Sequence, residues 1–250
     1  MTTASVRTLL VRALAVLFFL VLAGATYQGV ATALERRQFR HPGRLIRVGD
    51  HQLHIACMGE GAPSVVLEAP AIGMSSAWGW VQPEVARLTR VCTYDRAGLG
   101  WSEPGDQPYN PEAVPAELHA LLERSGERPP YVIAGEGLGA AFARLYAGQF
   151  TGDVAGLVLI DEPGTETTGP KATTSVALMD ASPWLARAGV LRATRLMSAN
   201  ARGLPPVSAG PLMAFLNRPD HLTRAASELS RWDETVTRAA HLPVPPSIRT

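Results

Sequence analysis

The sequence has few cysteines and no concentration of charge of either sign. Cys57 and Cys92 are the only cysteines, too few for a disulfide framework and spaced unlike the ligands of any metal site. Basic and acidic residues nearly balance, at 23 against 22, and no run of five or more basic residues alternates with aromatic ones. We therefore expect no nucleic-acid partner, no metal and no cofactor.

Charge is also missing from residues 13–34, which are mostly apolar. A helix of 22 residues spans about 33 Å, enough to cross the hydrocarbon core of a bilayer. The alternative is a secretory signal, with Arg7 and Arg12 before an apolar stretch and Ala23-Gly24-Ala25 as the cleavage site. Because the uncharged stretch continues well past Ala25, residues 1–40 favour an uncleaved membrane anchor.

The flanking charges bear on the orientation of this segment. Three arginines, Arg36, Arg37 and Arg40, follow it, whereas only Arg7 and Arg12 precede it. The excess of basic residues on the C-terminal side leans towards a cytoplasmic body, which is opposite to the export reading.

Short apolar segments alternate with helix-like ones through residues 41–162, which predicts one domain with a mostly parallel sheet covered by helices on both faces. The predicted strands are 45–48, 52–57, 64–68, 90–94, 131–134 and 156–160, and the predicted helices are 76–88, 111–124 and 138–150.

From residue 163 the pattern changes to helix alone. Segments 176–197 and 220–240 are predicted helices, joined by a loop over 203–211, and residues 163–240 would form a lid over the carboxyl ends of the strands. Residues 241–250 form a proline-rich tail with no further strand pattern, so we expect a sheet that is incomplete at its C-terminal side.

The turn after the predicted strand 131–134 has no nucleophilic side chain. It reads Gly135, Glu136, Gly137, Leu138, Gly139 and opens a helix of small residues. Such a glycine-rich turn specifies a backbone geometry, whereas acyl transfer needs a side-chain oxygen or sulfur at its third position.

Together with this turn, four other stretches resemble bacterial α/β-hydrolases of the membrane-anchored, lipase and haloperoxidase-like kind. The most specific is Asp95-Arg-Ala-Gly-Leu-Gly-Trp-Ser102; the others are residues 42–44, 54–59 and 65–69. The resemblance implies an α/β-hydrolase fold for residues 30–162, C-terminally incomplete because its seventh and eighth strands are missing.

Carried over by position, the resemblance places the nucleophile at Gly137, preceded by Glu136. Its oxyanion donors would be the backbone N–H groups of Leu138 and of a residue near Ala71. Pro70 departs from the family pattern, since proline has no N–H and a fixed φ.

The acid and the base are also missing from their usual places after strands seven and eight. Asp161 is a weak candidate for the acid, and a carboxylate bonded to local backbone is the better interpretation. His221 and His241 lie in the lid and tail, so neither fits the base. His54 is expected to be a solvated or locally bonded strand residue.

The residues therefore predict a membrane-associated, catalytically inactive protein that at most binds a small apolar ligand under the lid. The alternative is a hydrolase of carboxylic esters or related acyl compounds.

The strand order 1-2-4-3-5-6 of the resembled family also implies that Cys57 and Cys92 lie on neighbouring strands, close enough for a disulfide. It would leave strand 156–160 as an unpaired edge, because the prolines make the tail a poor pairing strand.

Overall fold

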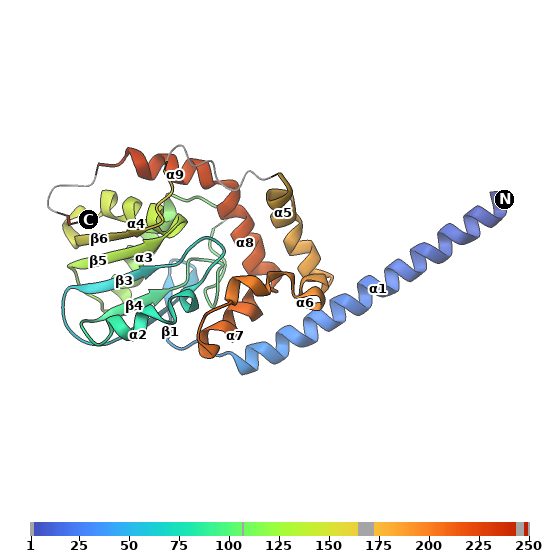
Figure 1. Cartoon of the computed structure of the whole chain (residues 1–250), viewed down its shortest axis with the longest axis horizontal. Coiled ribbons are helices and arrows are strands. Elements are labelled where there is room, and N and C mark those ends of the chain that lie inside the picture. The colour runs from blue at the N-terminus through green and yellow to red at the C-terminus, as the bar shows by residue number, and fades with distance from the viewer. Residues whose placement is uncertain (1–2, 107, 165–172, 244–247, 250) are drawn as a thin grey trace.

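A computed structural model describes residues 3–106, 108–164, 173–243 and 248–249 (Figure 1). Its sheet has the strand order β1-β2-β4-β3-β5-β6. Strands β3, β4, β5 and β6 are mutually parallel, while β2 pairs antiparallel with β1 and β4. The strand bounds are Arg44–Val48 (β1), His51–Met58 (β2), Ser64–Glu68 (β3), Val91–Tyr94 (β4), Tyr131–Glu136 (β5) and Val154–Ile160 (β6). The predicted mostly parallel sheet is confirmed.

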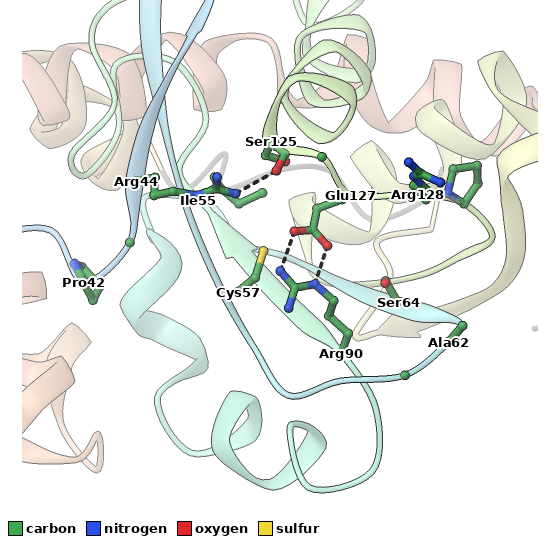
Figure 2. Close-up of a pocket in the computed structure, with 14 residues that line it drawn as sticks. Pro42, Arg44, Ile55, Cys57, Ala62, Ser64, Arg90, Ser125, Glu127 and Arg128 are labelled. Atoms are coloured by element: carbon green, nitrogen blue, oxygen red, sulfur yellow. Dashed lines mark hydrogen bonds and ion pairs between the residues drawn. The ribbon is translucent and has the colours of Figure 1, made fainter.

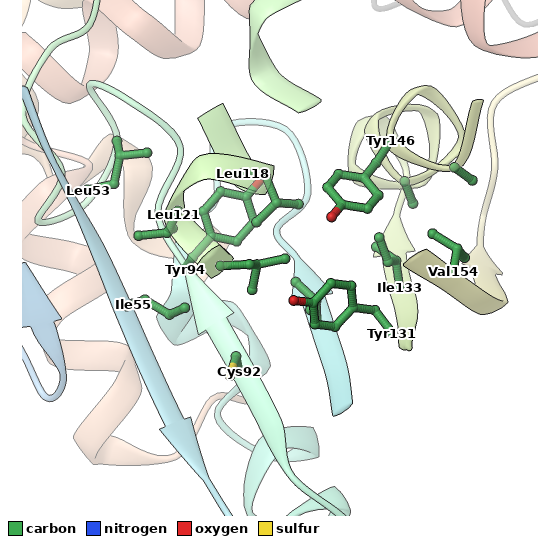
Figure 3. Packing of buried hydrophobic residues seen from close by; sticks show 14 of the residues in the cluster. Leu53, Ile55, Cys92, Tyr94, Leu118, Leu121, Tyr131, Ile133, Tyr146 and Val154 are labelled. Atoms are coloured by element: carbon green, nitrogen blue, oxygen red, sulfur yellow. The ribbon is translucent and has the colours of Figure 1, made fainter. Parts of the chain in front are cut away.

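Helices cover both faces of this sheet. On one face, α3 (Ala113–Ser125) and α4 (Leu138–Gln149) bury Leu118, Leu121 and Tyr146 against Tyr94, Tyr131 and other strand residues (Figure 3). On the other face, a 3₁₀ turn at Ser75–Trp78 and α2 (Val81–Val85) pack on Leu67 and Val91. Strand residues alternate between the two clusters because successive side chains point to opposite faces.

The helices after β6 differ in detail from the predicted ones. They are α5 (Thr173–Arg187), α6 (Val190–Thr194), a 3₁₀ helix (Leu196–Ala201), α7 (Pro206–Phe215), α8 (Pro219–Ser230) and α9 (Trp232–His241). The predicted helix 176–197 breaks at Gly189, whose φ is 71°. The loop predicted over 203–211 is wrong from Pro206 onward, because proline there starts α7, where its fixed φ and missing N–H are tolerated.

Helix α9 covers α4, and α5 to α8 form a separate group beside the strand ends (Figure 1). Val236 and Ala239 of α9 pack with Leu138 and Phe142 of α4 in one buried cluster. A second cluster joins α6, α7 and α8 to Met74, which follows β3. The α5–α8 group is therefore the part of the chain that lies over the loops after β3 and β4.

One long apolar helix, α1 (Thr3–Gln38), leads into the body, and its N-terminal half projects away from it (Figure 1). Its C-terminal half packs on the lid. Gly24 lies so close to Ala188 that a Cβ there would stand 2.1 Å from the carbonyl oxygen. Gln28 is buried and donates to the carbonyl of Asn217 at 2.6 Å, and Arg192 pairs with Glu35. The part of α1 free to enter a membrane thus precedes Gly24.

Strand β6 pairs with β5 on its inner side, and on its outer side it is paired at one point among the described residues. The Arg249 N–H donates to Ala155 O at 3.3 Å, Leu157 N–H donates to Arg249 O at 2.8 Å, and Ile248 is buried in the core. The expectation of an unpaired edge is wrong there, because Arg249 carries the N–H that the prolines before it lack. Val158 and Ile160 still expose 48% and 39% of their surface.

The two cysteines stand directly opposite each other on β2 and β4 and form a disulfide. Their Cα atoms are 4.0 Å apart. The predicted neighbouring placement is confirmed.

Candidate functional site

The turn between β5 and α4 has the backbone of a nucleophile elbow. Gly137 adopts φ 56° and ψ −120°, and its N–H donates to Ile160 O at 2.9 Å. A Cβ at Gly137 would meet nothing within 4 Å, so a side chain there would project into open space. By contrast, a Cβ at Gly139 would stand 2.6 Å from Glu68 O, so that position needs glycine. The elbow keeps its geometry while offering no reactive atom.

The two predicted backbone donors lie in one region. Ala71 packs against the buried cluster that contains Leu138, the residue after the elbow glycine. The carbonyls on either side of Ala71 are engaged: Pro70 O accepts from Arg96 Nη2 at 3.2 Å, and Ile72 O accepts from the His221 ring at 3.0 Å. The loop after β3 is thus fixed by two side chains from distant parts of the chain.

Arg96 is the centre of a buried ionic cluster beneath this loop. Its Nε and Nη2 donate to the two carboxylate oxygens of Glu228 at 2.9 and 2.7 Å. Its Nη1 donates to Glu68 at 2.6 Å and to Ala69 O at 2.7 Å. Arg224 also donates to Glu228, at 3.0 Å. The cluster ties the ends of β3 and β4 to lid helix α8.

The two carboxyl groups of this cluster differ in their protonation behaviour. Burial raises the pKa of Glu68, and the attraction of Arg96 does not fully offset it. Burial also acts on Glu228, but two arginines, Arg96 and Arg224, hold its pKa below the ordinary value. The charged form is thus favoured more at Glu228 than at Glu68, and the Tyr94 hydroxyl also donates to Glu68.

Asp95, next to Arg96, organises the loop that follows β4. Its carboxylate accepts from the N–H groups of Ser75 at 2.6 Å and Trp101 at 3.0 Å, and it pairs with His54 Nδ1 at 2.9 Å. Burial opposes the charge, but His54 and these donors lower the pKa of Asp95. His54 is fully buried, so the expectation of a solvated residue is wrong; it is a structural partner of Asp95.

His221 lies on α8 with both ring nitrogens engaged. Nδ1 accepts from Gly100 N–H at 3.0 Å and Nε2 donates to Ile72 O at 3.0 Å, which requires the neutral ring. Burial lowers its pKa, which favours that neutral form. The ring spans the loops after β3 and β4 and has no nitrogen left to act as a base.

The remaining predicted candidates are peripheral. Asp161 follows β6, is exposed, and has a φ of 47°. Glu136 is half-buried at the end of β5. His241 ends α9, is exposed, and donates to Thr237 O. None of these contacts links the three residues to one another or to Gly137.

A cavity of about 830 Å³ lies at the other end of the sheet, by the amino ends of β3, β4 and β5 (Figure 2). Three of its charged groups are engaged: Arg90 makes two bonds to Glu127, at 2.6 and 2.7 Å, and Arg44 donates to Ser125 O. Cys57, Cys92 and Glu127 come close enough to share an ion, but the sulfurs are bonded to each other. Ligands of open α/β sheets bind at the opposite, carboxyl end.

A smaller, more apolar cavity of about 360 Å³ lies where α1 reaches the body. It is bounded by Phe39, Met58, Trp101 and Pro211, and by the hydroxyl-bearing Ser75 and Ser76. The hydroxyls of both serines are buried and have no hydrogen-bond partner among the described residues. Neither of these two cavities is lined by Gly137, Leu138 or Ala71.

Fold and elbow together define a protein of the α/β-hydrolase fold whose elbow holds glycine. Residues 61–249 match the model of the Alpha/beta hydrolase family, and the chain belongs to that family. The Cif epoxide hydrolase of Acinetobacter nosocomialis has a similar structure, with a TM-score of 0.69 at 15% identity over 87% of this chain and 76% of that one.

The sequence relatives match only part of this chain and a smaller or equal part of their own length. An uncharacterized protein of Schizosaccharomyces pombe is 24% identical over 182 residues, 60% of this chain and 34% of that protein. An uncharacterized protein of Bacillus subtilis is 29% identical over 103 residues, 41% of each chain. The chain thus spans a third to two fifths of the length of these two relatives, and neither name states an activity.

The sequence did not reveal the ionic cluster or the role of His221. Arg96 and Asp95 stood within the most specific motif, which could have marked them as buried charges needing partners. Their partners Glu228 and His54 lie 132 and 41 residues away, so no local pattern connects them.

Proposed function

We propose that this protein is a membrane-tethered α/β-hydrolase-fold protein that does not carry out acyl transfer. The observation that supports this is Gly137: the elbow backbone is formed, the space beside it is open, and no side chain occupies it. Loss of a triad member costs about 10⁴ to 10⁶-fold in rate. The one lid histidine that contacts the site loop, His221, is engaged through both nitrogens.

The test is an assay of the full chain on short p-nitrophenyl esters, together with labelling by a fluorophosphonate. We expect the uncatalysed rate and no label, because no residue at the elbow can form an acyl-enzyme. Gly137→Ser should fold, since the added atoms meet open space, yet show neither turnover nor an acylation burst.

The same assay decides the alternative of an ester hydrolase. Turnover that persists through purification and disappears on substitution within residues 131–162 would establish that alternative. A burst in Gly137→Ser would mean that a base reaches the elbow.

We further propose that the cavity of about 360 Å³ near Phe39 takes a small apolar ligand with one polar group. Its lining is mainly apolar, and the partnerless hydroxyls of Ser75 and Ser76 provide hydrogen bonds for a carbonyl or hydroxyl. With the chain in nanodiscs, 1-aminoanthracene, a fluorescent apolar probe with one polar group, should bind above the empty-disc background. Ser76→Phe should weaken binding at least about tenfold by filling the space, whereas Leu88→Phe, at an exposed site, should not. Equal binding by both variants would refute the ligand site.

We propose from the disulfide that the body lies on the oxidising side of the membrane. Disulfides are rare in the reducing cytosol, and Cys57 and Cys92 are bonded. This orientation opposes the one that the flanking arginines favoured. In intact cells, protease added outside should digest the body, and a membrane-permeant maleimide should label it only after reduction. Protection from protease together with labelling before reduction would support the cytoplasmic orientation and the free thiols expected there.

A further inference from the structure

A separate cavity of about 350 Å³ lies between lid helix α8 and the loop after β4. Arg36 of α1 and Arg218, the residue before α8, both line it, with the rings of Trp101 and Phe215 beside them. Gly137, Leu138 and Ala71 are not among its lining residues, so it is distinct from the elbow.

Arg218 is a buried cation without a counter-ion bond. It is 9% exposed, its guanidinium carbon lies 3.8 Å from the centre of the Phe215 ring, and its Nε and Nη2 have no hydrogen-bond partner among the described residues. Burial, strengthened by the nearby charge of Arg36, lowers the pKa of Arg218 to about 10. Leaving such a group unpaired is costly, and an anion would remove that cost.

The surroundings add further positive potential. Helix α8 has 12 residues and begins with Pro219, and its first-turn residues Asp220 and His221 line the cavity, so the positive end of the helix dipole lies beside it. Arg36 is exposed and makes no ion pair with a described residue. Glu35, the acidic neighbour on α1, is already paired with Arg192.

Two carboxylates also line the cavity and limit what it can accept. Glu103 is engaged, accepting from Gln52 N–H at 2.8 Å. Asp220 stands in the first turn of α8 and partly offsets the charge of Arg218. A small anion in the cavity would offset the charge of Arg218, and a guanidinium group can donate two parallel hydrogen bonds to the oxygens of such an anion.

We propose that this cavity binds a small oxyanion, a carboxylate or a phosphate group, between the guanidinium groups of Arg218 and Arg36. The planar edge of Arg218 fits the two oxygens of such a group, and the Trp101 and Phe215 rings offer contact to an attached apolar body. The site does not depend on whether the elbow is catalytic.

The test uses the full chain in phosphatidylcholine nanodiscs, titrated calorimetrically with inorganic phosphate and with benzoate. We expect at least one probe to bind, and Arg218→Gln and Arg36→Gln each to weaken it by about tenfold or more. Arg37→Gln makes the same charge change one residue away, outside the cavity lining, and should leave the affinity within about twofold.

Asp220→Asn gives a variant with the opposite expected sign. Removing its negative charge should tighten binding, by about threefold or more, while Arg218 stays in place. This keeps the proposal testable if Arg218→Gln fails to fold. Absence of binding by both probes, or equal weakening in Arg36→Gln and Arg37→Gln, would overturn the site.

The same titration separates a lipid headgroup from a free anion. Dihexanoyl phosphatidic acid, below its micelle concentration, should bind at least about tenfold more tightly than inorganic phosphate if the ligand is a headgroup. Equal affinities would assign the site to a soluble anion. Tight binding of the lipid that Arg36→Gln and Arg218→Gln leave unchanged would count against the site.

Discussion

The loops after β4 and β5 differ in what their side chains do: the first holds paired buried charges, and the second has a turn without a side chain. After β4, Asp95 and Arg96 are fully buried and each engages several partners across the strand ends and lid. After β5, Gly137 retains an unusual backbone conformation with nothing beside it. An unpaired buried charge costs stability, whereas a nucleophile is needed only for chemistry. The loop after β4 is therefore constrained by stability in a way that the elbow side chain is not.

The largest loss of stability is expected from Arg96→Ala, which tests the structural role of the loop after β4. It would leave Glu68 buried without its cation and Glu228 with Arg224 alone, and breaking such a pair costs about 3–5 kcal/mol. Urea denaturation should show a large loss of stability or an unfolded chain. Arg87→Ala breaks an exposed pair with Glu84 and should leave the midpoint unchanged. Similar midpoints for the two variants would refute the structural role of the cluster.

A matched pair of glycines compares the two loops directly. Gly100 and Gly137 have φ values of 51° and 56°, so alanine is strained at both. At Gly137 strain is the whole cost, about 1–2 kcal/mol, because the Cβ meets nothing. At Gly100 the Cβ would stand 2.4 Å from an oxygen of Asp95, and relieving that overlap adds about 1–3 kcal/mol. Gly100→Ala should have the lower urea midpoint; the reverse order would contradict the comparison.

The sequence alone predicts the features that have a local pattern, but not the contacts between distant residues. Strand 64–68 and the turn at 135–139 were predicted from apolar runs and glycine spacing, since both patterns are local. The bond from His221 to Ile72 spans 149 residues, and nothing in either segment specifies the other. Helix α7 was missed because proline usually marks a loop, while at a first helical turn it is favoured.

A smaller effect is expected from pH, through the histidine that joins the lid to both site loops. Burial lowers the pKa of His221 below its ordinary 6.5, so below that pH the unfolded chain binds more protons than the folded one. The stability that depends on the neutral ring is therefore present above about pH 6.5 and is lost as the pH falls through the folded-state pKa.

The measurement is the change in urea midpoint between pH 7.5 and pH 5.5. His221→Gln should lose less stability over this interval than the unsubstituted chain, whatever its absolute stability. His241→Gln, at an exposed ring, should show the original pH dependence. An unaltered pH dependence in His221→Gln would mean that protonation of this ring does not limit the lid contact.

The smallest effect on stability is expected at β6, which separates the elbow strand from solvent. β4 is enclosed by β2 and β3, but among the described residues β6 pairs on its outer side with Arg249 alone, and Val158 and Ile160 remain exposed. We expect the body, residues 41–250 without the anchor, to be marginally stable and to self-associate through this edge.

Val158→Lys should reduce association in sedimentation velocity while changing the free energy of unfolding by less than about 0.5 kcal/mol, because the side chain is half exposed. A body that is already monomeric and unfolds in one transition above about 65 °C would show that the single contact suffices to protect the edge.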